Sequence, residues 1–366
     1  MRLIIGAAAN GRHPTRSCPP LRLADTICFP PHSLMQKVSI PKTDLHASII
    51  VLGTDYFGST VSRKDSMQLM DCYLETGGNV LDTAESYACF VPGGDHQSET
   101  VIGEWLRDRR TRDRVIISTK GAHPRFATMH IPRMSKAEIQ SDLDSSLQRL
   151  GIECVDIYWL HRDAPGYPVE EILQSLESFR QAGKIRYAGF SNWTQARAEE
   201  ARQAAQRLGI QGFIASQNMW SLAKPDLSQT DSTWACIDDS YAQWHVKNGL
   251  SAFPFISQAG GYFRRMELGT LEQLPKDNRI RRMFDNQENR ERFQRILQLG
   301  QLEGLSVGQI VLAYLTNQPF PVFPLIGPKT LPDLQESLSN AGAKLSHGKL
   351  TYLEKGVPSA PGPCVS

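Results

Sequence analysis

The 366-residue sequence predicts an α/β protein of the (β/α)8 barrel class, built as a single domain. Short apolar runs of strand length alternate with longer runs of helical period, and this alternation occurs eight times. Several of the helical runs are followed directly by a glycine, as helix ends commonly are: Gly77, Gly151, Gly183 and Gly209. Eight regular βα units favour a closed barrel over an open doubly wound sheet.

The elements follow one another in regular order. The apolar runs predict strands at 49–52, 79–81, 115–119, 155–160, 187–190, 212–216, 252–256 and 322–326. The runs of helical period predict helices at 66–76, 99–107, 136–150, 169–182, 194–208, 238–247, 290–302 and 307–317. Residues from Met35 to the first strand are expected to form a hairpin that caps the barrel floor, and an extra C-terminal helix is expected to start at Leu331.

Both ends of the chain differ from this pattern, so the barrel domain is placed at residues 35–345. Residues 1–34 carry four Arg and one Asp without a periodic apolar pattern. They are interpreted either as a targeting leader or as a mis-annotated start upstream of Met35. Residues 346–366, which end in Pro358-Ser-Ala-Pro-Gly-Pro-Cys-Val-Ser, are expected to form a flexible tail.

Composition excludes several classes of protein. A count of 40 Lys and Arg against 38 Asp and Glu gives a net charge of +2, which does not indicate a nucleic-acid partner. The longest apolar run near the N-terminus, residues 3–9, is far shorter than a membrane-spanning helix. Seven Cys without a CxxC pair indicate neither a disulfide framework nor a thiolate metal site, and favour a reducing, cytoplasmic location. No HExxH or comparable His spacing occurs, and no metal is expected.

Charged residues close three consecutive predicted strands. Asp82, Lys120 and His161 each follow an apolar run, where a charge costs desolvation free energy unless it has a partner or a function. The C-terminal ends of barrel strands form the mouth where barrel enzymes keep their active sites. Tyr87, five residues after Asp82, lies in a loop that leads over the same mouth. We therefore expect Asp82, Tyr87, Lys120 and His161 to form one cluster.

This set of side chains is suited to proton transfer. A Tyr with a pKa near 10 is a poor acid at neutral pH unless a cation stabilises its phenolate, and a buried Lys supplies that cation. The Lys in turn needs a carboxylate partner, and a nearby His can orient a substrate oxygen. The cluster predicts protonation of a carbonyl oxygen as hydride reaches the carbon.

Six segments of the sequence together resemble the aldo-keto reductase family, in order and spacing, between Val38 and Ala341. They are Gly53-Thr-Asp-Tyr-Phe-Gly, Gly78-Asn-Val-Leu-Asp-Thr-Ala-Glu-Ser-Tyr, Ser118-Thr-Lys-Gly, Leu160-His-Arg-Asp, Gly183-Lys-Ile-Arg-Tyr-Ala-Gly-Phe-Ser-Asn-Trp and Gln217-Asn-Met-Trp-Ser-Leu. The resemblance implies that Tyr87 is the general acid, that Lys120 and Asp82 tune it, and that His161 orients the carbonyl. It also implies a nicotinamide cofactor bound across the barrel mouth, consistent with the lack of a GxGxxG after the first strand.

By the same resemblance, the residues that hold the cofactor are Gly53, Thr54, Asp82, Ser191, Asn192, Gln217, Trp220, Ser257, Gly260, Lys329 and Glu336. Ser191, Asn192 and Gln217 would hold the carboxamide, and the Trp220 ring would stack on the nicotinamide. Lys329 precedes a helix whose N-cap is Thr330, so a cation and a positive helix end meet at one point, as a phosphate requires. Ser337 departs from the Asn of the family pattern, and Asp333 is interpreted as a helix-capping acid rather than a group facing the 2′-phosphate. NADP(H) is favoured over NAD.

Two other functions stay open. Lys120 could be the Schiff-base nucleophile of a barrel aldolase, although that function gives the expected cofactor residues no role. Alternatively, the chain could be a slow nicotinamide-binding sensor or regulatory subunit. The partner expected is a small aldehyde or ketone, with no nucleic acid and no membrane, and the oligomeric state is left open. Four aromatic residues predict an apolar pocket for substrates that include sugar-derived ones: Phe90, Trp220, Trp234 and Tyr262.

Overall fold

The computed structural model describes residues 35–356. The predictions for residues 1–34, and for the chain beyond residue 356, lie outside the described residues.

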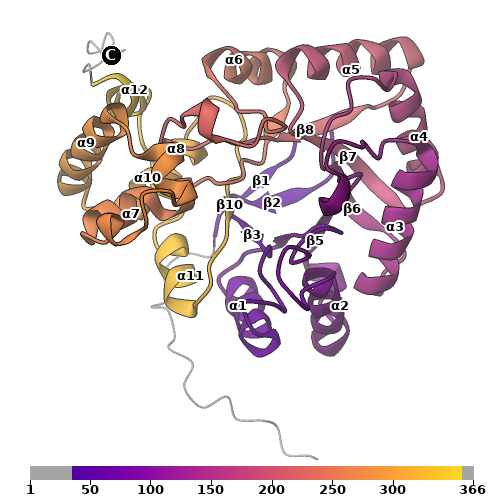
Figure 1. Cartoon of the computed structure of the whole chain (residues 1–366), viewed down its shortest axis with the longest axis horizontal. Helices are drawn as coiled ribbons and strands as arrows, with labels where there is room; N and C mark the ends of the chain where they lie inside the picture. Colours follow the sequence, from indigo (N-terminus) through magenta and orange to yellow (C-terminus); the bar gives the residue numbers. More distant parts are fainter. Residues whose placement is uncertain (1–34, 357–366) are drawn as a thin grey trace, which may run out of the picture. The chain divides into compact units, whose positions relative to one another are not determined.

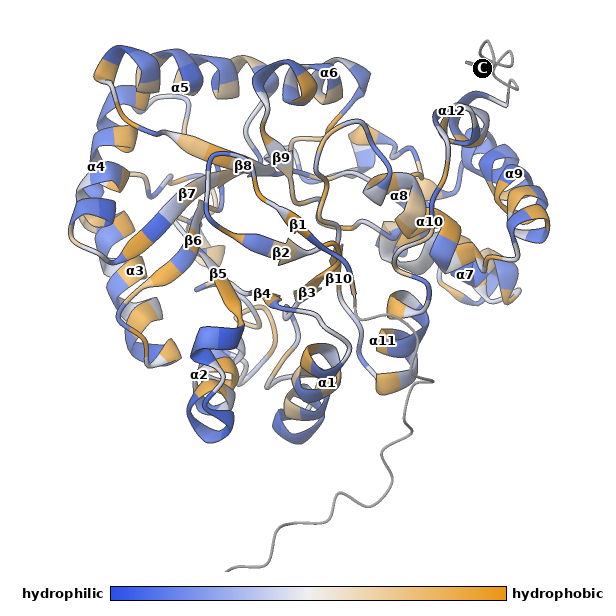
Figure 2. Cartoon of the chain, turned by 180° about the vertical axis from the view of Figure 1, so that it is seen from behind, coloured by the Kyte–Doolittle hydropathy of each residue, from blue (hydrophilic) through white to orange (hydrophobic). Residues whose placement is uncertain are grey.

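The described chain begins with an antiparallel hairpin. Strand β1 (Lys37–Ser39) pairs with β2 (His46–Ser48), with Val38 opposite Ala47. Ile40, Leu45 and Ala47 pack against apolar side chains inside the barrel, and Figure 2 shows the hairpin lying across the strands. The amide of Asn79, just before a barrel strand, holds it further by accepting from Ser48 N (2.7 Å) and donating to His46 O (2.9 Å). The predicted hairpin over the barrel floor is confirmed.

Eight parallel strands follow, in the spatial order β10-β3-β4-β5-β6-β7-β8-β9 (Figure 1). Their bounds are β3 (Val51–Gly53), β4 (Val80–Asp82), β5 (Ile116–Gly121), β6 (Val155–Leu160), β7 (Ile185–Ser191), β8 (Phe213–Gln217), β9 (Ser251–Ala252) and β10 (Leu325–Ile326). The two ends of the sheet meet where Phe323 N donates to Ala252 O (2.8 Å) and Leu325 N donates to Pro254 O (3.0 Å). The predicted (β/α)8 barrel is confirmed.

The last two barrel strands are shorter than predicted. Prolines interrupt both segments, at Pro254 after β9 and at Pro321 and Pro324 before β10. Because proline has no N–H group, it cannot donate to the ladder of a central strand. The chain is extended there, but only two residues of each segment form a regular strand.

Helices surround the barrel, each between consecutive strands. They are α1 (Arg63–Glu75), α2 (Gln97–Arg109), α3 (Lys136–Leu150), α4 (Val169–Gln181), α5 (Gln195–Leu208) and α6 (Asp239–Asn248). Local signals fix their ends. Helix α3 begins with a capping box formed by Ser135 and Glu138, and it ends at Gly151 in the left-handed conformation. For this reason the predicted bounds of α3, residues 136–150, match the observed ones.

Several helices follow β9. Between β9 and β10 lie α7 (Tyr262–Glu267), α8 (Arg279–Phe284), α9 (Gln287–Glu303) and α10 (Val307–Thr316). The predicted extra helix after the last strand is α11 (Leu331–Leu338), which packs against both α1 and α10. A flexible tail was expected from residue 346, and that boundary is wrong. Residues His347–Lys355 form α12, which packs on α9 and buries Leu350 and Leu353.

Apolar side chains fill two layers of the barrel. Val51, Val80, Ile157 and Phe253 lie in the cluster inside the strands, whereas a larger cluster lies between strands and helices. The alternation of side chains along each strand produces this division. Packing on both faces therefore fixes the strands, and with them the positions of the polar residues at their C-terminal ends.

Within residues 35–356, no single helix is long and apolar enough to span a membrane. Helices α9 and α10 pass that length and composition test only as a pair, across a 94° bend.

Candidate active site

The four residues expected to form one cluster meet at the C-terminal mouth of the barrel. Asp82 ends β4, Lys120 lies near the end of β5, and His161 directly follows β6. Tyr87 comes from the loop after β4, where Tyr87 N donates to Ala84 O (3.1 Å) in a turn. Because all eight strands are parallel, their C-terminal ends lie at one end of the barrel.

Lys120 is the centre of the cluster. Its Nζ donates to Asp82 Oδ2 (2.5 Å), to the Thr83 carbonyl oxygen (2.7 Å) and to Tyr87 Oη (2.9 Å). Lys120 and Asp82 are buried, while Tyr87 and His161 are partly exposed. The tyrosine and the histidine are therefore the members that a substrate can reach.

The contacts of Lys120 do not favour the aldolase alternative. An ammonium group has three N–H donors, and all three are engaged here. A Schiff-base lysine must instead present a free amine to a carbonyl carbon. The side chain is also only 1% exposed, which leaves no path for that attack.

The phenol of Tyr87 holds its proton firmly. Its burial, followed by the negative charges of Asp82 and Asp55, raises the pKa of Tyr87 well above the usual value. Burial also lowers the pKa of Lys120, although the Asp82 carboxylate opposes this shift. A proton is thus present on Tyr87 at neutral pH, and the N–H from Lys120 is in place to stabilise the phenolate that its loss would leave.

His161 is uncharged at neutral pH. Burial, followed by the neighbouring His123, Arg162 and Lys120, lowers its pKa well below 6.5. Its Nδ1 lies 3.2 Å from Ser86 Oγ, and the His123 ring lies against it with centroids 4.8 Å apart. When the Ser86 hydroxyl donates to Nδ1, the single imidazole proton is on Nε2 and available to an acceptor.

The residues expected to hold a carboxamide gather beside the cluster. Gln217 Nε2 donates to Asp82 Oδ1 (2.9 Å), and Ser191 Oγ donates to the Gln217 carbonyl oxygen (2.6 Å). Asn192 has a left-handed backbone (φ 63°), and its Nδ2 donates to the His161 carbonyl oxygen (3.1 Å). Gly53 and Thr54 also adjoin Asp82, but the Thr54 hydroxyl is engaged with the Asp82 carbonyl oxygen (2.9 Å) and with Ser98.

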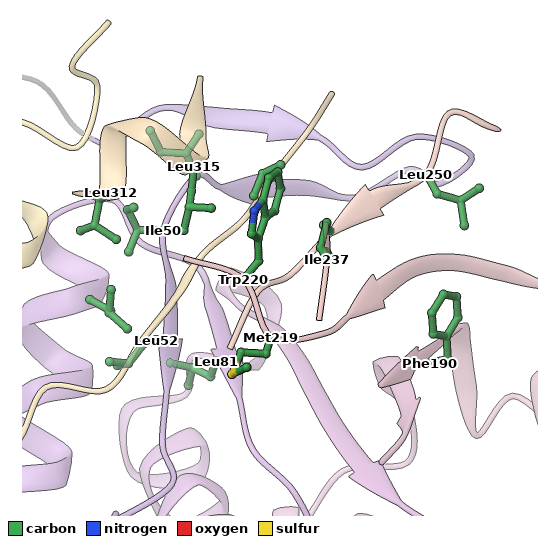
Figure 3. Packing of buried hydrophobic residues seen from close by; sticks show 14 of the residues in the cluster. Ile50, Leu52, Leu81, Phe190, Met219, Trp220, Ile237, Leu250, Leu312 and Leu315 are labelled. Atoms are coloured by element: carbon green, nitrogen blue, oxygen red, sulfur yellow. The ribbon is translucent and has the colours of Figure 1, made fainter. Parts of the chain in front are cut away.

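Trp220 does not lie where its expected role requires. Its ring is buried and parallel to that of Phe320, with centroids 5.9 Å apart, and edge-on to Tyr314. Figure 3 shows the indole among buried aliphatic side chains that include Ile237 and Leu315. This corrects the expectation that Trp220 stacks on a nicotinamide, because the residue is only 9% exposed and belongs to the hydrophobic core.

Phe255 is the aromatic residue that the sequence analysis missed. It follows β9, two residues after Phe253, and side chains two apart on an extended strand share a face. Phe253 points into the barrel, so Phe255 lies on the inner face nearer the mouth, and it is only half-buried. The alternation Phe253, Pro254, Phe255 was the signal that could have found it.

Strained backbone surrounds the mouth. Ala122, Asn192 and Ile256 follow β5, β7 and β9, and all have positive φ, at 62°, 63° and 53°. Positive φ is unfavourable for a β-branched residue such as Ile256, and strain of this kind concentrates at functional sites. Ser257 directly follows Ile256, and its Oγ donates to Leu325 O (2.5 Å). The exposed Gly260, three residues further on, also has a positive φ, at 62°.

The residues predicted to bind a phosphate lie at the start of α11. Thr330 caps the helix by accepting from Asp333 N (3.3 Å), and its hydroxyl donates to Asp333 Oδ2 (2.8 Å). The capping box predicted for Asp333 is only partly formed, because its carboxylate accepts from the Thr330 hydroxyl rather than from the Thr330 backbone N–H. Lys329 is exposed, with Nζ 4.3 Å from the centre of the Tyr56 ring.

Glu336 makes a contact that the sequence did not predict. Its carboxylate accepts from Ser306 Oγ (3.1 Å) at the N-cap of α10. A Cβ added at Gly308 would lie 2.3 Å from Glu336 Oε1, so Gly308 leaves the space that the carboxylate occupies. Glu336 thus joins α11 to the positive end of α10.

Four further polar residues of the mouth were missed. Ser118 Oγ donates to Asp82 Oδ1 (2.6 Å), and Ser118 shares the inner face of β5 with Lys120, two residues away. Asp55 follows β3 and is a charge after an apolar strand, the same signal that identified Asp82. Ser86 and Arg162 carried no separate sequence signal, because each was placed by the fold beside His161.

The expected apolar pocket is only partly formed. Trp220 and Tyr262 are both core residues, with Tyr262 fully buried against Phe263. Phe90 is exposed and packs edge-on against Tyr56, and Trp234 packs edge-on against Phe255. In residues 35–356, no three His, Cys, Asp or Glu side chains gather in a metal-binding arrangement.

We expect stability to fall as the pH is lowered from about 6.5 to about 4. Burial lowers the pKa of His245 to about 4, and its ring contacts Ser216 Oγ (3.0 Å) and Leu250 O (3.2 Å). The unfolded chain takes up a proton below pH 6.5 that the folded chain refuses until about pH 4. By pH 4 this difference costs about 3 kcal/mol of unfolding free energy.

Urea unfolding of the His245→Gln variant between pH 4 and 8 checks this expectation. The variant should lose less unfolding free energy on acidification than the wild type, whereas His347→Gln, at an exposed histidine, should behave as the wild type does. Comparison with the wild type is needed because Asp55, whose pKa burial raises to about 6, gives a contribution of opposite sign. Equal pH dependence in all three proteins would contradict a buried neutral His245.

The structure therefore defines a (β/α)8 barrel with Asp82, Tyr87, Lys120 and His161 gathered at its C-terminal mouth. A sequence model of the Aldo/keto reductase family matches residues 49–356. The chain belongs to the aldo/keto reductase family.

Named relatives agree with this assignment. The chain is 25% identical over 350 residues to a norsolorinic acid reductase of Emericella nidulans, covering 90% of this chain and 83% of that one. It is also 25% identical over 350 residues to a putative aryl-alcohol dehydrogenase of Saccharomyces cerevisiae, covering 90% and 88%. A crystal structure of a thermostable aldo-keto reductase in complex with epalrestat shares the fold, with a TM-score of 0.65, 21% identity, and coverage of 87% and 99%. Family and relatives support oxidoreductase activity.

Proposed function

We propose that this protein reduces the carbonyl group of an aldehyde or ketone with NADPH, and catalyses the reverse oxidation of the alcohol. The observation that carries this proposal is the partly exposed Tyr87 hydroxyl, which receives a hydrogen bond from the buried Lys120–Asp82 pair. His161 lies beside it, with ring centroids 6.0 Å apart. A proton donor and a second polar group therefore face one point at the mouth.

Each member of the cluster has one task. When bound, NADPH would supply the hydride for the carbonyl carbon. Tyr87 gives its proton to the carbonyl oxygen, and the Lys120 N–H then stabilises the phenolate. Asp82 keeps Lys120 charged in its buried position. Neutral His161 orients the carbonyl oxygen by donating from Nε2.

The residues of the mouth fit a nicotinamide dinucleotide. The polar side chains of Ser191, Asn192 and Gln217 lie next to the cluster. They include both donors and acceptors, which a carboxamide needs. The strained turn from Ile256 to Gly260 brings backbone close to the mouth. Lys329 and the start of α11 supply positive charge for a phosphate, which favours NADP(H) over NAD.

The names of the relatives describe both directions of such a reaction, since they include reductases and alcohol dehydrogenases. The partner proposed here is a small carbonyl compound rather than a nucleic acid or a membrane. Cys72, Cys89, Cys154 and Cys236 are free thiols, which suits a reducing compartment such as the cytoplasm.

Titration of the purified protein with NADPH and NADH, followed by fluorescence, tests the proposal together with NADPH oxidation on a panel of aldehydes and ketones. Tight NADPH binding with turnover is the expected result. Tight binding without turnover would instead favour the sensor function. Absence of binding would remove the basis of the proposal.

Replacement of Lys329 by Ala should raise the KM for NADPH by about 10-fold and change the KM for NADH by less than about 2-fold. Only NADPH carries the 2′-phosphate that the Lys329 ammonium is proposed to pair with. Steady-state kinetics with both cofactors measure the difference, and Lys344→Ala, at another exposed lysine, is the matched control. Equal effects on both cofactors would assign Lys329 a structural role.

A further inference from the structure

Arg162 is a buried cation whose hydrogen-bonding groups are mostly unused. It directly follows His161, and its side chain is only 10% exposed. A guanidinium has five N–H donors. Here Nη1 donates to the His161 carbonyl oxygen (3.0 Å), whereas Nε is buried without a partner among the described residues. Arginine is rarely buried unless it is paired, so donors left free at this depth indicate a ligand.

The free donors lie beside the reacting groups. The positive charge of Arg162 contributes to the lowered pKa values of His161 and His123, and it opposes the rise in the pKa of Tyr87. The geometry agrees: Arg162 Nη1 donates to the His161 carbonyl oxygen (3.0 Å), and the His161 ring lies 6.0 Å from that of Tyr87 and 4.8 Å from that of His123, between ring centroids. Arg162 therefore lies next to the histidine that is proposed to orient the carbonyl.

A carboxylate faces Arg162 across a gap. Asp231 Oδ2 is 4.0 Å from Arg162 Nη2, which is too far for a hydrogen bond. The other oxygen, Oδ1, is held by Thr233 through its backbone N–H (2.8 Å) and its hydroxyl (2.7 Å). The loop therefore fixes Asp231 with one oxygen free toward Arg162.

A hydroxyl group matches this gap. It accepts from the guanidinium with its oxygen lone pairs and donates its proton to the carboxylate, so a single hydroxyl satisfies both. A methylene group would leave the buried Nε–H of Arg162 without a partner, which is costly. A substrate carboxylate would be attracted by Arg162 but repelled by Asp231.

From these contacts we infer that Arg162 and Asp231 form a subsite for a hydroxyl group next to the reacting carbonyl, and that the substrate class is uncharged hydroxyaldehydes and hydroxyketones. This inference rests on the proposed carbonyl reduction. It replaces the expected apolar pocket with a polar subsite. Trp234 lies on the same loop as Asp231, and its backbone N–H donates to the Asp231 carbonyl oxygen (2.9 Å).

Kinetics with three small aldehydes test the subsite. We expect kcat/KM for glyceraldehyde to exceed that for propanal, which lacks both hydroxyls, and that for glyoxylate, which carries a carboxylate. Arg162→Met and Asp231→Asn should each reduce the glyceraldehyde-to-propanal ratio by about 10- to 100-fold, the range expected for a lost hydrogen bond to a charged group. Arg180→Met, which removes an exposed arginine paired with Glu177, should keep the wild-type ratio.

A binding measurement separates this inference from the proposed function. Saturation-transfer NMR should detect glycerol, but not 1-propanol, on the wild-type protein, and Arg162→Met should abolish the glycerol signal. That result without turnover of any carbonyl would support the subsite and contradict the reductase. Equal kcat/KM for glyceraldehyde and propanal, a preference for glyoxylate, or glycerol binding that Arg162→Met does not change would each overturn the subsite.

Discussion

Replacement of Tyr87 by Phe should lower kcat for carbonyl reduction by about 10²- to 10⁴-fold and leave the Kd for NADPH within about 2-fold of the wild-type value. The substitution removes one hydroxyl and keeps the ring, which lies 4.4 Å from Lys120 Nζ. Lys120 retains its contacts to Asp82 and Thr83, so the buried charge stays paired. The loss is therefore confined to the proton donor.

Single-turnover kinetics with saturating NADPH, together with fluorescence titration of the cofactor, measure the two expected effects. Tyr56→Phe is the matched control, because it removes a phenol at the same mouth that has no contact with Lys120. Near-wild-type turnover by the Tyr87→Phe protein would remove Tyr87 from the role of general acid. A parallel loss of NADPH affinity would point instead to a disturbed cofactor site.

Replacement of Lys120 by Met should both abolish turnover and lower the unfolding free energy by about 3 to 5 kcal/mol. Asp82 is fully buried, and loss of the ammonium leaves its carboxylate with hydrogen bonds from Ser118, Gln217 and Tyr87 but without a countercharge. A double variant, Asp82→Asn with Lys120→Met, removes both charges. It should recover most of the stability and none of the activity, because the phenolate stays without a cation.

Urea unfolding and NADPH oxidation assays on the single and double variants separate these two roles of the ion pair. The exposed pair of Asp144 and Lys184 (2.6 Å) is the matched control. Its double replacement by Asn and Met should cost less than about 1 kcal/mol and no activity. Recovery of turnover in the Asp82→Asn, Lys120→Met protein would show that the charge of Lys120 is not required.

The residues found at the barrel mouth show which sequence patterns predict a site reliably. Asp82, Lys120 and His161 could be found because a polar residue after an apolar barrel strand has to lie at the C-terminal mouth. The positions of strand residues depend on covalent geometry, which alternates side chains between two faces. Ser118 and Phe255 obeyed the same alternation and could have been found in the same way.

The positions of Trp220 and Glu336 depended on partners distant in the sequence. Trp220 lies in the core because Phe320, 100 residues later, covers its ring, and Glu336 contacts Ser306 and the space left by Gly308. Residues 347–355 form a helix rather than a tail because α9 offers an apolar face to Leu350 and Leu353. No pattern in the neighbouring sequence predicts any of these contacts.

The sequence by itself determined the barrel, the order of its elements, the caps of α3 and α11, and the strand ends that bear the reacting groups. Each of these depends on interactions within a few residues, such as periodicity, capping and alternation along a strand. The tertiary structure alone decided which loop side chains face the mouth, and it placed Arg162 opposite Asp231. Those two residues lie on different loops, and only closure of the barrel brings their charges within 4.0 Å of each other.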